Sequence, residues 1–265
     1  MSTRITILGC GSSGGVPRVG NVWGACDPSN PKNRRRRCAL LVERFGKSGR
    51  TSVLVDTPPD LREQLLDARV ETLDAVLYTH DHADHTHGID DLRGAAFNAR
   101  RRVDVHMDAH TRAVLVQRFD YCFVQPPGSG YPAILSAHDV VPGTAIRIEG
   151  AGGAIEALPI LQQHGDITSL GYRFGDIAYS PDISDVPEAS LPLLAGLDLW
   201  IVDALRPMPH PSHFSLKQAV QWIARVGAKR AILTHMTSEL DYAAMRRDLP
   251  AHIEPAYDGM VIEVE

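Results

Sequence analysis

Three histidines and two aspartates fill one six-residue segment of this 265-residue chain, His80-Asp81-His82-Ala83-Asp84-His85. These side chains would repel one another when protonated and would resist burial when unpaired. A divalent metal removes both problems, because neutral imidazole and carboxylate are natural ligands of zinc and of neighbouring transition metals. The segment therefore predicts a metal centre. A histidine-rich surface turn and a purely structural zinc site are the alternatives.

The residues around this segment place it on a turn between a strand and a helix. Leu73–Thr79 is short, apolar and β-prone, which is typical of a buried strand, and Ile89–Arg100 has a helical pattern. Side chains on such a turn converge above the edge of a sheet. We expect the first two histidines of the segment to reach one metal, and Asp84 and His85 to reach a second. His87 is expected to be exposed or to lie behind the ligands.

The pattern His-x-His-x-Asp-His at the end of a strand resembles the signature of the metallo-β-lactamase fold superfamily, and the match is complete. The resemblance spans nearly the whole chain and implies further ligands downstream, each at the end of a strand. His164 resembles the third histidine of the first metal site. Asp182 resembles the carboxylate that bridges both metals, although Pro181 stands where the family more often has glycine. His235 resembles the last ligand of the second site.

The resemblance thus implies a centre with two metal ions. Its seven ligands are His80, His82, Asp84, His85, His164, Asp182 and His235. This set is too large for one tetrahedral ion, and sites built from His and Asp admit Zn and Mn alike. Two ions ~3.5–4 Å apart would activate a shared water and clamp the oxygens of a substrate. Asp84 and Asp182 therefore count among the expected catalytic residues. Taken singly, each downstream ligand could also be an ordinary hydrogen-bonded histidine or a turn-forming aspartate.

The composition is typical of a globular protein. Hydrophobic residues make up 44% and charged residues 22% of the chain, and one domain over residues 1–265 is expected. No segment approaches the ~20 apolar residues that span a bilayer, and the N-terminus does not resemble a signal peptide. Cys10, Cys26, Cys38 and Cys122 form no CxxC pair, which favours reduced thiols in a cytoplasmic protein. The net charge of −5 argues against a general nucleic-acid binder.

The order of elements predicts an α/β fold, the αββα sandwich of the metallo-β-lactamase type, with two mixed sheets face to face and helices outside. The expected strands cover residues 4–9, 38–44, 52–56, 73–79, 103–106, 144–149, 155–161, 170–174, 177–180, 198–203 and 229–234. The expected helices cover residues 58–67, 89–100, 109–119, 187–196, 215–226 and 238–248. Residues 125–132 are expected to form a loop.

Residues 9–37 form a second unusual region, with a glycine-rich opening and four consecutive arginines, Arg34–Arg37. Glycines let a backbone pass close to a ligand, but the region matches neither a Walker A loop nor a dinucleotide fingerprint. A tight turn and a solvated loop compete with a second interpretation, in which an arginine near the metals holds a phosphate. Some family members have an extra zinc site here. With only Cys26 and Cys38 nearby, we expect none.

The segment His210-Pro-Ser-His213 indicates which kind of hydrolase to expect. It leads into the expected helix 215–226, with Ser215 as N-cap. The phosphodiesterase branch of the superfamily includes ribonuclease Z and the phosphoribosyl cyclic phosphodiesterase. Its members have a histidine here that contacts the phosphate and assists the leaving oxygen. His213 fits this position better than His210, because it lies directly before the helix. A plain helix-entry residue is the alternative. Residues 23–28, Trp-Gly-Ala-Cys-Asp-Pro, also resemble the cyclic phosphodiesterase group.

Two further roles follow from these positions. His213, when protonated, would stabilise developing charge or give a proton to the departing alkoxide, which makes it the third expected catalytic residue. Asp56 ends the strand Val53-Leu-Val-Asp56 and is placed to accept a hydrogen bond from a ligand imidazole. A polar residue that merely ends a strand is the equal alternative for Asp56.

Three functions compete. The first is a metal-dependent phosphodiesterase that cleaves a small cyclic phosphate or a nucleotide-like phosphodiester by metal-activated water. The second is a ribonuclease Z-like nuclease, but no segment resembles the long arm of that family. The third is a metal-binding carrier protein of cofactor biosynthesis with little hydrolytic activity. The expected partner is a small phosphate-ester substrate, without a stable nucleic-acid complex or a membrane, and a homodimer is compatible with the sequence.

Overall fold

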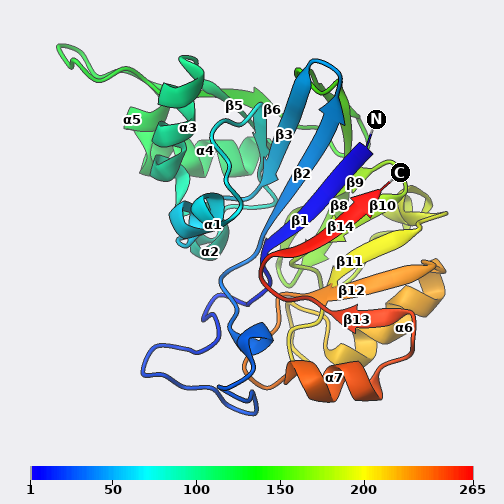
Figure 1. The fold of residues 1–265 in the computed structure, drawn as a ribbon. Helices are drawn as coiled ribbons and strands as arrows, with labels where there is room; N and C mark the ends of the chain where they lie inside the picture. The colour runs from blue at the N-terminus through cyan, green and yellow to red at the C-terminus, as the bar shows by residue number, and fades with distance from the viewer. Residues whose placement is uncertain (1, 265) are drawn as a thin grey trace.

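The structure, a computed structural model, describes residues 2–264. Its strands form two seven-stranded sheets that pack face to face, with helices along their outer sides (Figure 1). The predicted fold class, an αββα sandwich with two mixed sheets, is confirmed.

The first sheet has the order β14-β1-β2-β3-β4-β5-β6. Its strands are β1 (Ser2–Gly9), β2 (Ala39–Gly46), β3 (Gly49–Val55), β4 (Ala75–Leu77), β5 (Val103–Met107), β6 (Leu135–Asp139) and β14 (Met260–Val264). Pairing is antiparallel from β14 to β3 and parallel from β3 to β6. Because parallel strands end at the same edge, the residues that follow β3 and β4 meet there.

The second sheet has the order β13-β12-β11-β10-β9-β8-β7. Its strands are β7 (Ile146–Ile148), β8 (Ile155–His164), β9 (Ile167–Phe174), β10 (Ile177–Ser180), β11 (Leu199–Asp203), β12 (Arg230–Thr234) and β13 (Ile253–Pro255). Strands β10 to β13 are parallel, and β9 is antiparallel to both β8 and β10. Strands β8, β10, β11 and β12 therefore all end at one edge.

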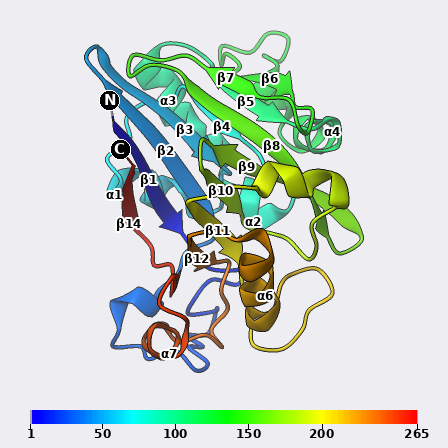
Figure 2. The same cartoon turned by 90° about the vertical axis from the view of Figure 1, so that its right-hand side faces the viewer.

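The helices lie on the outer sides of the sheets (Figure 1). The α-helices are α1 (Leu61–Asp67), α2 (Ala83–Thr86), α3 (Leu92–Ala99), α4 (Ala109–Arg118), α5 (Asp120–Phe123), α6 (Leu216–Val226) and α7 (Tyr242–Asp248). The 3₁₀ helices are η1 (Pro31–Asn33), η2 (Ile89–Asp91) and η3 (Glu188–Leu194). Helices α1 to α5 accompany the first sheet, whereas α6 and α7 accompany the second. After a quarter turn of the molecule, α3 and α4 lie toward the top of the view and α6 and α7 toward the bottom (Figure 2).

Alternating side chains of the strands separate two apolar cores. Ile5 from the first sheet and Ile201 from the second belong to the core between the sheets. Leu54 points the other way and packs with Leu61 and Leu115 beneath the helices. Each fully buried side chain of this size stabilises the fold by ~1.5–3 kcal/mol. The two cores hold the sheet edges in place, and the edges position the side chains described below.

Three strands of the structure were not predicted, β6, β13 and β14. Strand β13 has only three residues. Strand β14 lies at the edge of the first sheet and leaves Val261 half exposed, so its apolar pattern is weak. Both end strands are recruited by pairing with β12 and β1. Their formation depends on partners distant in sequence, which a local pattern does not reveal.

Several helix boundaries also differ from the prediction. The helix expected over 58–67 begins at Leu61, and the one expected over 89–100 opens with η2. The segment expected as helix 187–196 is the 3₁₀ helix η3, which contains Pro192 and so lacks one backbone donor. The helix expected over 238–248 begins only after Asp241, whose side chain caps it. The predicted N-cap Ser215 is confirmed within a full capping box.

Between β1 and β2 the chain makes a long excursion, residues 10–38, seen at the lower left of Figure 1. The buried Arg35 side chain donates to the carbonyl oxygens of Leu240 at 2.7 Å and Thr237 at 3.1 Å. The Lys32 ammonium lies over the rings of Tyr242 and Tyr257, 4.7 and 4.3 Å from their centroids. Thus the excursion is tied to the chain that follows β12.

Three of the four consecutive arginines have such fixing roles. Besides Arg35, Arg36 pairs with Asp258 at 3.2 Å and with Asp67 at 2.8 Å. Arg37 pairs with Asp60 at 2.9 Å. These contacts leave the solvated Arg34 as the one arginine of the run with an exposed side chain and no protein partner among residues 2–264. The phosphate-binding interpretation of this run therefore gains no support.

The four cysteines are unpaired and buried. The Sγ atom of Cys26 lies 3.4 Å from the Leu240 carbonyl oxygen, and the Sγ atom of Cys38 lies 3.5 Å from the Gly11 carbonyl oxygen.

Within residues 2–264 no helix is long and apolar enough to cross a membrane.

Candidate metal centre

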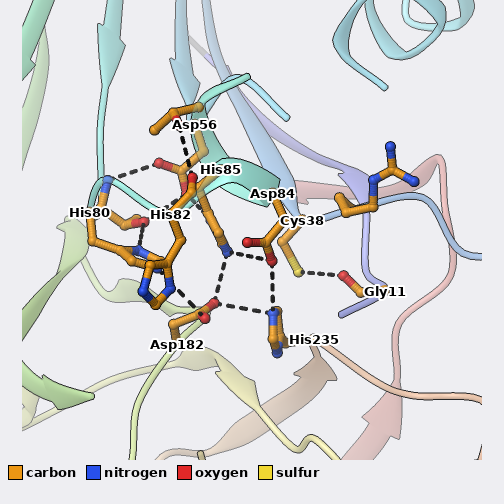
Figure 3. A network of polar contacts seen from close by, with 12 residues as sticks. Gly11, Cys38, Asp56, His80, His82, Asp84, His85, Asp182 and His235 are labelled. Carbon is orange, nitrogen blue, oxygen red and sulfur yellow. Dashed lines mark hydrogen bonds and ion pairs between the residues drawn. The ribbon is translucent and has the colours of Figure 1, made fainter. Parts of the chain in front are cut away.

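All seven predicted metal ligands lie together at the edge where strands of both sheets end. Figure 3 labels all of them except His164. The ligands His80, His82, Asp84 and His85 follow β4, His164 ends β8, Asp182 follows β10, and His235 follows β12. Strand direction thus explains the convergence, because all of these strands deliver their last residues to the same edge. Both sheets contribute to one centre.

The segment that follows β4 is divided by a single helical turn, α2. His82 precedes the turn with extended backbone, and Asp84 and His85 lie within it. The Thr86 hydroxyl donates to the His82 carbonyl oxygen at 2.8 Å and closes the turn. In Figure 3 His80 and His82 lie to one side of the centre, and Asp84 lies to the other. Because the backbone changes conformation here, neighbouring side chains point toward two different sites of the centre, the first at His80 and His82 and the second at Asp84.

Asp182 lies between these two sites. Its Oδ2 atom is 3.6 Å from Nε2 of His164 and 3.8 Å from Nε2 of His80. Its Oδ1 atom is 3.0 Å from Nε2 of His85 and 3.4 Å from Nε2 of His235. The two oxygens of one carboxylate therefore face different pairs of histidines. This is the arrangement expected of a ligand shared by two ions.

The donor atoms form three overlapping groups, and within each group they lie within 4.8 Å of one another. The groups are His80, His82, His164 and Asp182; Asp84, His85 and His235; and Asp182, His213 and His235. The first two groups match the two sites expected from the sequence. The third adds His213, which was expected beside the metals rather than among the ligand-type residues.

The buried atoms that lack a hydrogen-bond partner within residues 2–264 include four ligand atoms that face the centre. They are Nε2 of His80, His85 and His235 and Oδ1 of Asp182. An unsatisfied buried polar group costs ~1–3 kcal/mol, so four together call for an explanation. Imidazole nitrogens and a carboxylate oxygen at this spacing are satisfied by divalent cations. The residues present therefore fit a metal, and the clusters could hold one or more ions.

A layer of hydrogen bonds fixes the ligand rings from behind. His85 Nδ1 lies 2.7 Å from Asp56 Oδ2, as predicted for Asp56. Asp56 also accepts hydrogen bonds from the Thr79 amide and hydroxyl, each at 2.8 Å, and the same hydroxyl is 2.9 Å from His80 Nδ1. Asp56 adopts a left-handed φ of 65°, a strain of order 1–3 kcal/mol. These contacts leave Nε2 of both rings directed at the centre.

His164 is held in the same way, whereas Nδ1 of His235 has no hydrogen-bond partner among residues 2–264. His164 Nδ1 lies 2.7 Å from the Ser212 carbonyl oxygen, which requires Nδ1 to be the donor. His235 has a left-handed φ of 57°, and its Nδ1 is 3.8 Å from Asp203 Oδ1. Each ring therefore has one nitrogen turned to the protein and one turned to the centre.

His213 lies against this centre, whereas His210 lies at its rim. The His213 ring is 4.7 Å from the rings of His164 and His235, and it stacks on His235 at 12°. Its Nε2 is 3.9 Å from Asp182 Oδ2. The His210 ring is 5.2 Å from that of His213. The preference for His213 over His210 matches their positions.

Sequence reasoning missed Asp203. This aspartate ends β11, is fully buried, and its Oδ2 lies 2.7 Å from Nδ1 of His213. It also accepts a hydrogen bond from the Ile183 amide at 3.2 Å. The missed signal is a carboxylate that ends an otherwise apolar strand, the same signal that pointed to Asp56 and Asp182.

Burial and neighbouring charges set the protonation of these groups. Burial, aided by the nearby His85, lowers the pKa of His80 well below its usual value. Burial also lowers the pKa of His164 to about 4. Burial opposes ionisation of Asp182, but His235 and His85 outweigh it and hold the pKa of this carboxyl well below its usual range. Neutral imidazoles and an ionised carboxylate are the forms that bind metals.

His85 and the His213–Asp203 pair behave differently. Burial opposes a proton on His85, but Asp182 and Asp84 outweigh it and raise the pKa of this imidazole well above its usual value. A metal cation would take the place of that proton. Burial lowers the pKa of His213 and raises the pKa of Asp203, so it disfavours charge on both partners.

His87 is exposed, as expected from the sequence. Its ring packs edge-on against Phe119 with 5.6 Å between centroids. His87 is therefore separate from the ligand groups described above.

Comparisons with known proteins agree with this geometry. A protein-family profile described as "Beta-lactamase superfamily domain" matches residues 51–236, well over half of the chain. A curated relative from Porphyromonas gingivalis (strain ATCC BAA-308 / W83), named octanoyltransferase, is 32% identical over 262 residues. The match covers 97% of this chain but 51% of that protein, so the chain spans about half the length of this relative.

Two solved structures extend the comparison. A diphosphatase from the PhnP family is 36% identical, with a TM-score of 0.87 over 100% of this chain and 98% of the other. The short form of human tRNase Z is 18% identical, with a TM-score of 0.65 over 98% of each chain. At that lower identity the likeness concerns the fold alone.

Proposed function

The chain belongs to the beta-lactamase superfamily, and on that premise we propose that it is a metal-dependent phosphodiesterase acting on a small phosphate ester. The observation that carries the proposal is the buried pair of His213 and Asp203 beside the shared carboxylate of Asp182. The 36% identity to a diphosphatase over the whole chain supports chemistry at phosphorus.

The donor groups fit two divalent ions, Zn or Mn. One ion would be held by His80, His82, His164 and Asp182, and the other by Asp84, His85, His235 and Asp182. Bound there, the ions would supply a nucleophile at neutral pH and neutralise the charge of the phosphate. Asp84 and Asp182 would thus serve catalysis by holding the ions.

The chain itself supplies the proton. Nδ1 of His213 donates to Asp203, which leaves Nε2 free to face the substrate. When protonated, Nε2 donates to the oxygen that leaves the phosphorus, or to a non-bridging oxygen of the phosphate. The carboxylate of Asp203 stabilises that imidazolium and fixes the orientation of the ring. A bound phosphate adds negative charge nearby, which opposes the effect of burial and favours the protonated form of His213.

A substrate panel tests the proposal. The purified protein is stripped with a chelator, reloaded with Zn or Mn, and assayed with bis(p-nitrophenyl) phosphate, a cyclic nucleotide, ADP, an octanoyl thioester and a β-lactam. We expect the loaded protein to hydrolyse the phosphodiesters fastest and the stripped protein to be inactive. A thioester or lactam cleaved faster than every phosphate compound would contradict the proposal.

Replacement of the shared carboxylate tests the role of the metals. Asp182→Asn removes the negative charge that faces both pairs of histidines, so we expect fewer than two ions per chain and a loss of ~10³-fold or more in kcat/KM. Elemental analysis and the bis(p-nitrophenyl) phosphate assay measure both. Asp176→Asn, at an exposed position paired with Arg173, is the matched control and should change neither. Full metal content and rate in Asp182→Asn would rule out a bridging carboxylate at this position.

A further inference from the structure

A pocket of about 510 Å³ opens beside the metal centre at His82. It is lined by Asp81, His82, Ala83, His87, Arg118 and Phe119. Among the seven proposed ligands His82 is the one with an exposed side chain, and the others are buried or half-buried. A molecule whose phosphate reaches the centre can therefore extend over His82 into this pocket.

Two aromatic rings stand on one side of the pocket. The rings of His87 and Phe119 meet edge to face at 80°, with 5.6 Å between their centroids. Phe119 joins α4 to α5, and its backbone leaves the helical conformation there, with φ −133° and ψ 42°. It is half-buried, so a face remains for contact. A flat ring stacks favourably on such a surface.

A guanidinium stands at the rim. Arg118 Nη1 donates to the Asp81 carbonyl oxygen at 2.9 Å, and Nη2 is 3.6 Å from the Asp81 carboxylate. In the described residues no other hydrogen bond is made by this guanidinium, so most of its five N–H donors are available to a ligand. Arg118 is thus held in place and still has N–H donors for a ligand.

The surroundings of Arg118 favour a ring over a second phosphate. The Asp81 carboxylate lies close enough to offset much of the charge of Arg118, and a phosphate bound there would meet Asp81 as well. Ala83 and Phe119 add apolar surface, which a phosphate would not use. A planar aromatic group with polar atoms on its edge satisfies both the apolar wall and the guanidinium.

We propose that this pocket is the specificity site for an aromatic ring carried by the phosphate ester, as in a nucleotide. The ring stacks on Phe119 and His87, Arg118 donates to its polar edge, and the phosphate reaches the centre over His82. This inference rests on the proposed function and deepens it, because it selects ring-bearing phosphate esters over plain sugar phosphates.

Calorimetry with the metal-loaded protein tests the pocket without any need for turnover. AMP and ribose 5-phosphate share the phosphate and the sugar but differ in the adenine. We expect AMP to bind roughly tenfold more tightly, the usual effect of one stacked base. Phe119→Ala and Arg118→Gln should each remove most of that difference and leave ribose 5-phosphate unchanged. Phe119→Leu, which keeps an apolar side chain of more similar size than alanine, separates loss of stacking from loss of packing.

Arg112→Gln provides the matched control. Arg112 lies on the same helix as Arg118 but pairs with Asp139, at 2.8 and 2.9 Å, away from the pocket. It should bind AMP like the unmodified protein. Equal binding of AMP and ribose 5-phosphate, no binding of AMP, or an equal effect of the variants on both ligands would overturn the inference.

The same samples separate this inference from the proposed function. Hydrolysis of bis(p-nitrophenyl) phosphate without a preference for AMP would support the phosphodiesterase activity and contradict the specificity pocket. The reverse outcome is a protein that hydrolyses no phosphate ester but prefers AMP through Phe119. It would support the specificity pocket and contradict the phosphodiesterase activity.

Discussion

Two histidine–aspartate pairs in this protein have almost the same hydrogen-bond length in opposite surroundings. His213 Nδ1 lies 2.7 Å from Asp203, and His138 Nε2 lies 2.8 Å from Asp104. The side chains of the first pair are 10% and 0% exposed, whereas those of the second are 46% and 45% exposed. The length of the bond therefore does not distinguish them. Their environments do.

The second ring nitrogen shows what the difference means. In the buried pair, Nε2 of His213 faces Asp182, and little water competes for it. In the exposed pair, the His138 ring stacks on His106 at 4.9 Å and 24°, and water screens its contact with Asp104. A histidine–aspartate pair is suited to proton transfer when the free nitrogen opens onto a reactive centre. The outer pair lacks such a centre.

The largest expected difference between the pairs concerns His213→Ala. This variant should keep its metals but lose ~10²–10⁴-fold in rate, the usual contribution of a positioned acid–base residue. The loss should be greatest for an alkoxide leaving group and smaller for p-nitrophenolate, which departs without a proton. Hydrolysis rates on both substrate types measure this loss, and elemental analysis measures the metal content. His138→Ala is the control. A uniform loss across substrates would indicate phosphate binding by His213 instead.

Asp203→Asn should have a smaller effect. The amide keeps the shape but not the charge that stabilises the imidazolium, so we expect a ~10–100-fold loss in kcat/KM. The pKa of His213 should fall, because the amide no longer stabilises the imidazolium, while Asp182 and Asp84 still oppose the effect of burial. The limb of the pH–rate profile on which His213 loses its proton should move to lower pH. Asp104→Asn should leave the profile unchanged. A slower enzyme with an unshifted profile would mean that Asp203 acts only structurally.

The smallest effect is expected for the outer pair itself. His138→Gln should change kcat/KM by less than twofold and should lower the free energy of unfolding by no more than ~0.2–1 kcal/mol, the range for exposed pairs. Urea unfolding at low and high salt measures this, and the difference should shrink in salt. A loss comparable to that of Asp203→Asn would break the distinction drawn between the two pairs.

The sequence revealed the parts of the centre that are local. The segment His80–His85 combines several ligand types in one turn, and the apolar runs before His164, Asp182 and His235 mark the ends of strands. The fold and the downstream ligands were expected from the resemblance to the metallo-β-lactamase fold superfamily, and the direction of the parallel strands explains why their ends meet. Asp56 was placed correctly from its position at the end of a strand.

The remaining contacts depend on partners that no local pattern indicates. Asp203 meets His213 because β11 lies between β10 and β12, an order fixed by the whole sheet. Strand β14 forms by pairing with β1 from the other end of the described chain. The burial of Arg35 depends on carbonyl groups that follow β12. Such features follow from tertiary context, which overrides local propensity.

The origin of the centre in both sheets has a consequence for biosynthesis. His85 leaves the ribosome about 150 residues before His235. At about 5–20 residues per second, roughly 8–30 s pass between them. During that interval the histidine-rich segment is made, but its partners from the second sheet do not yet exist. The metal content of the mature protein is therefore expected to reflect the cation supply during translation as well as the preference of the finished site.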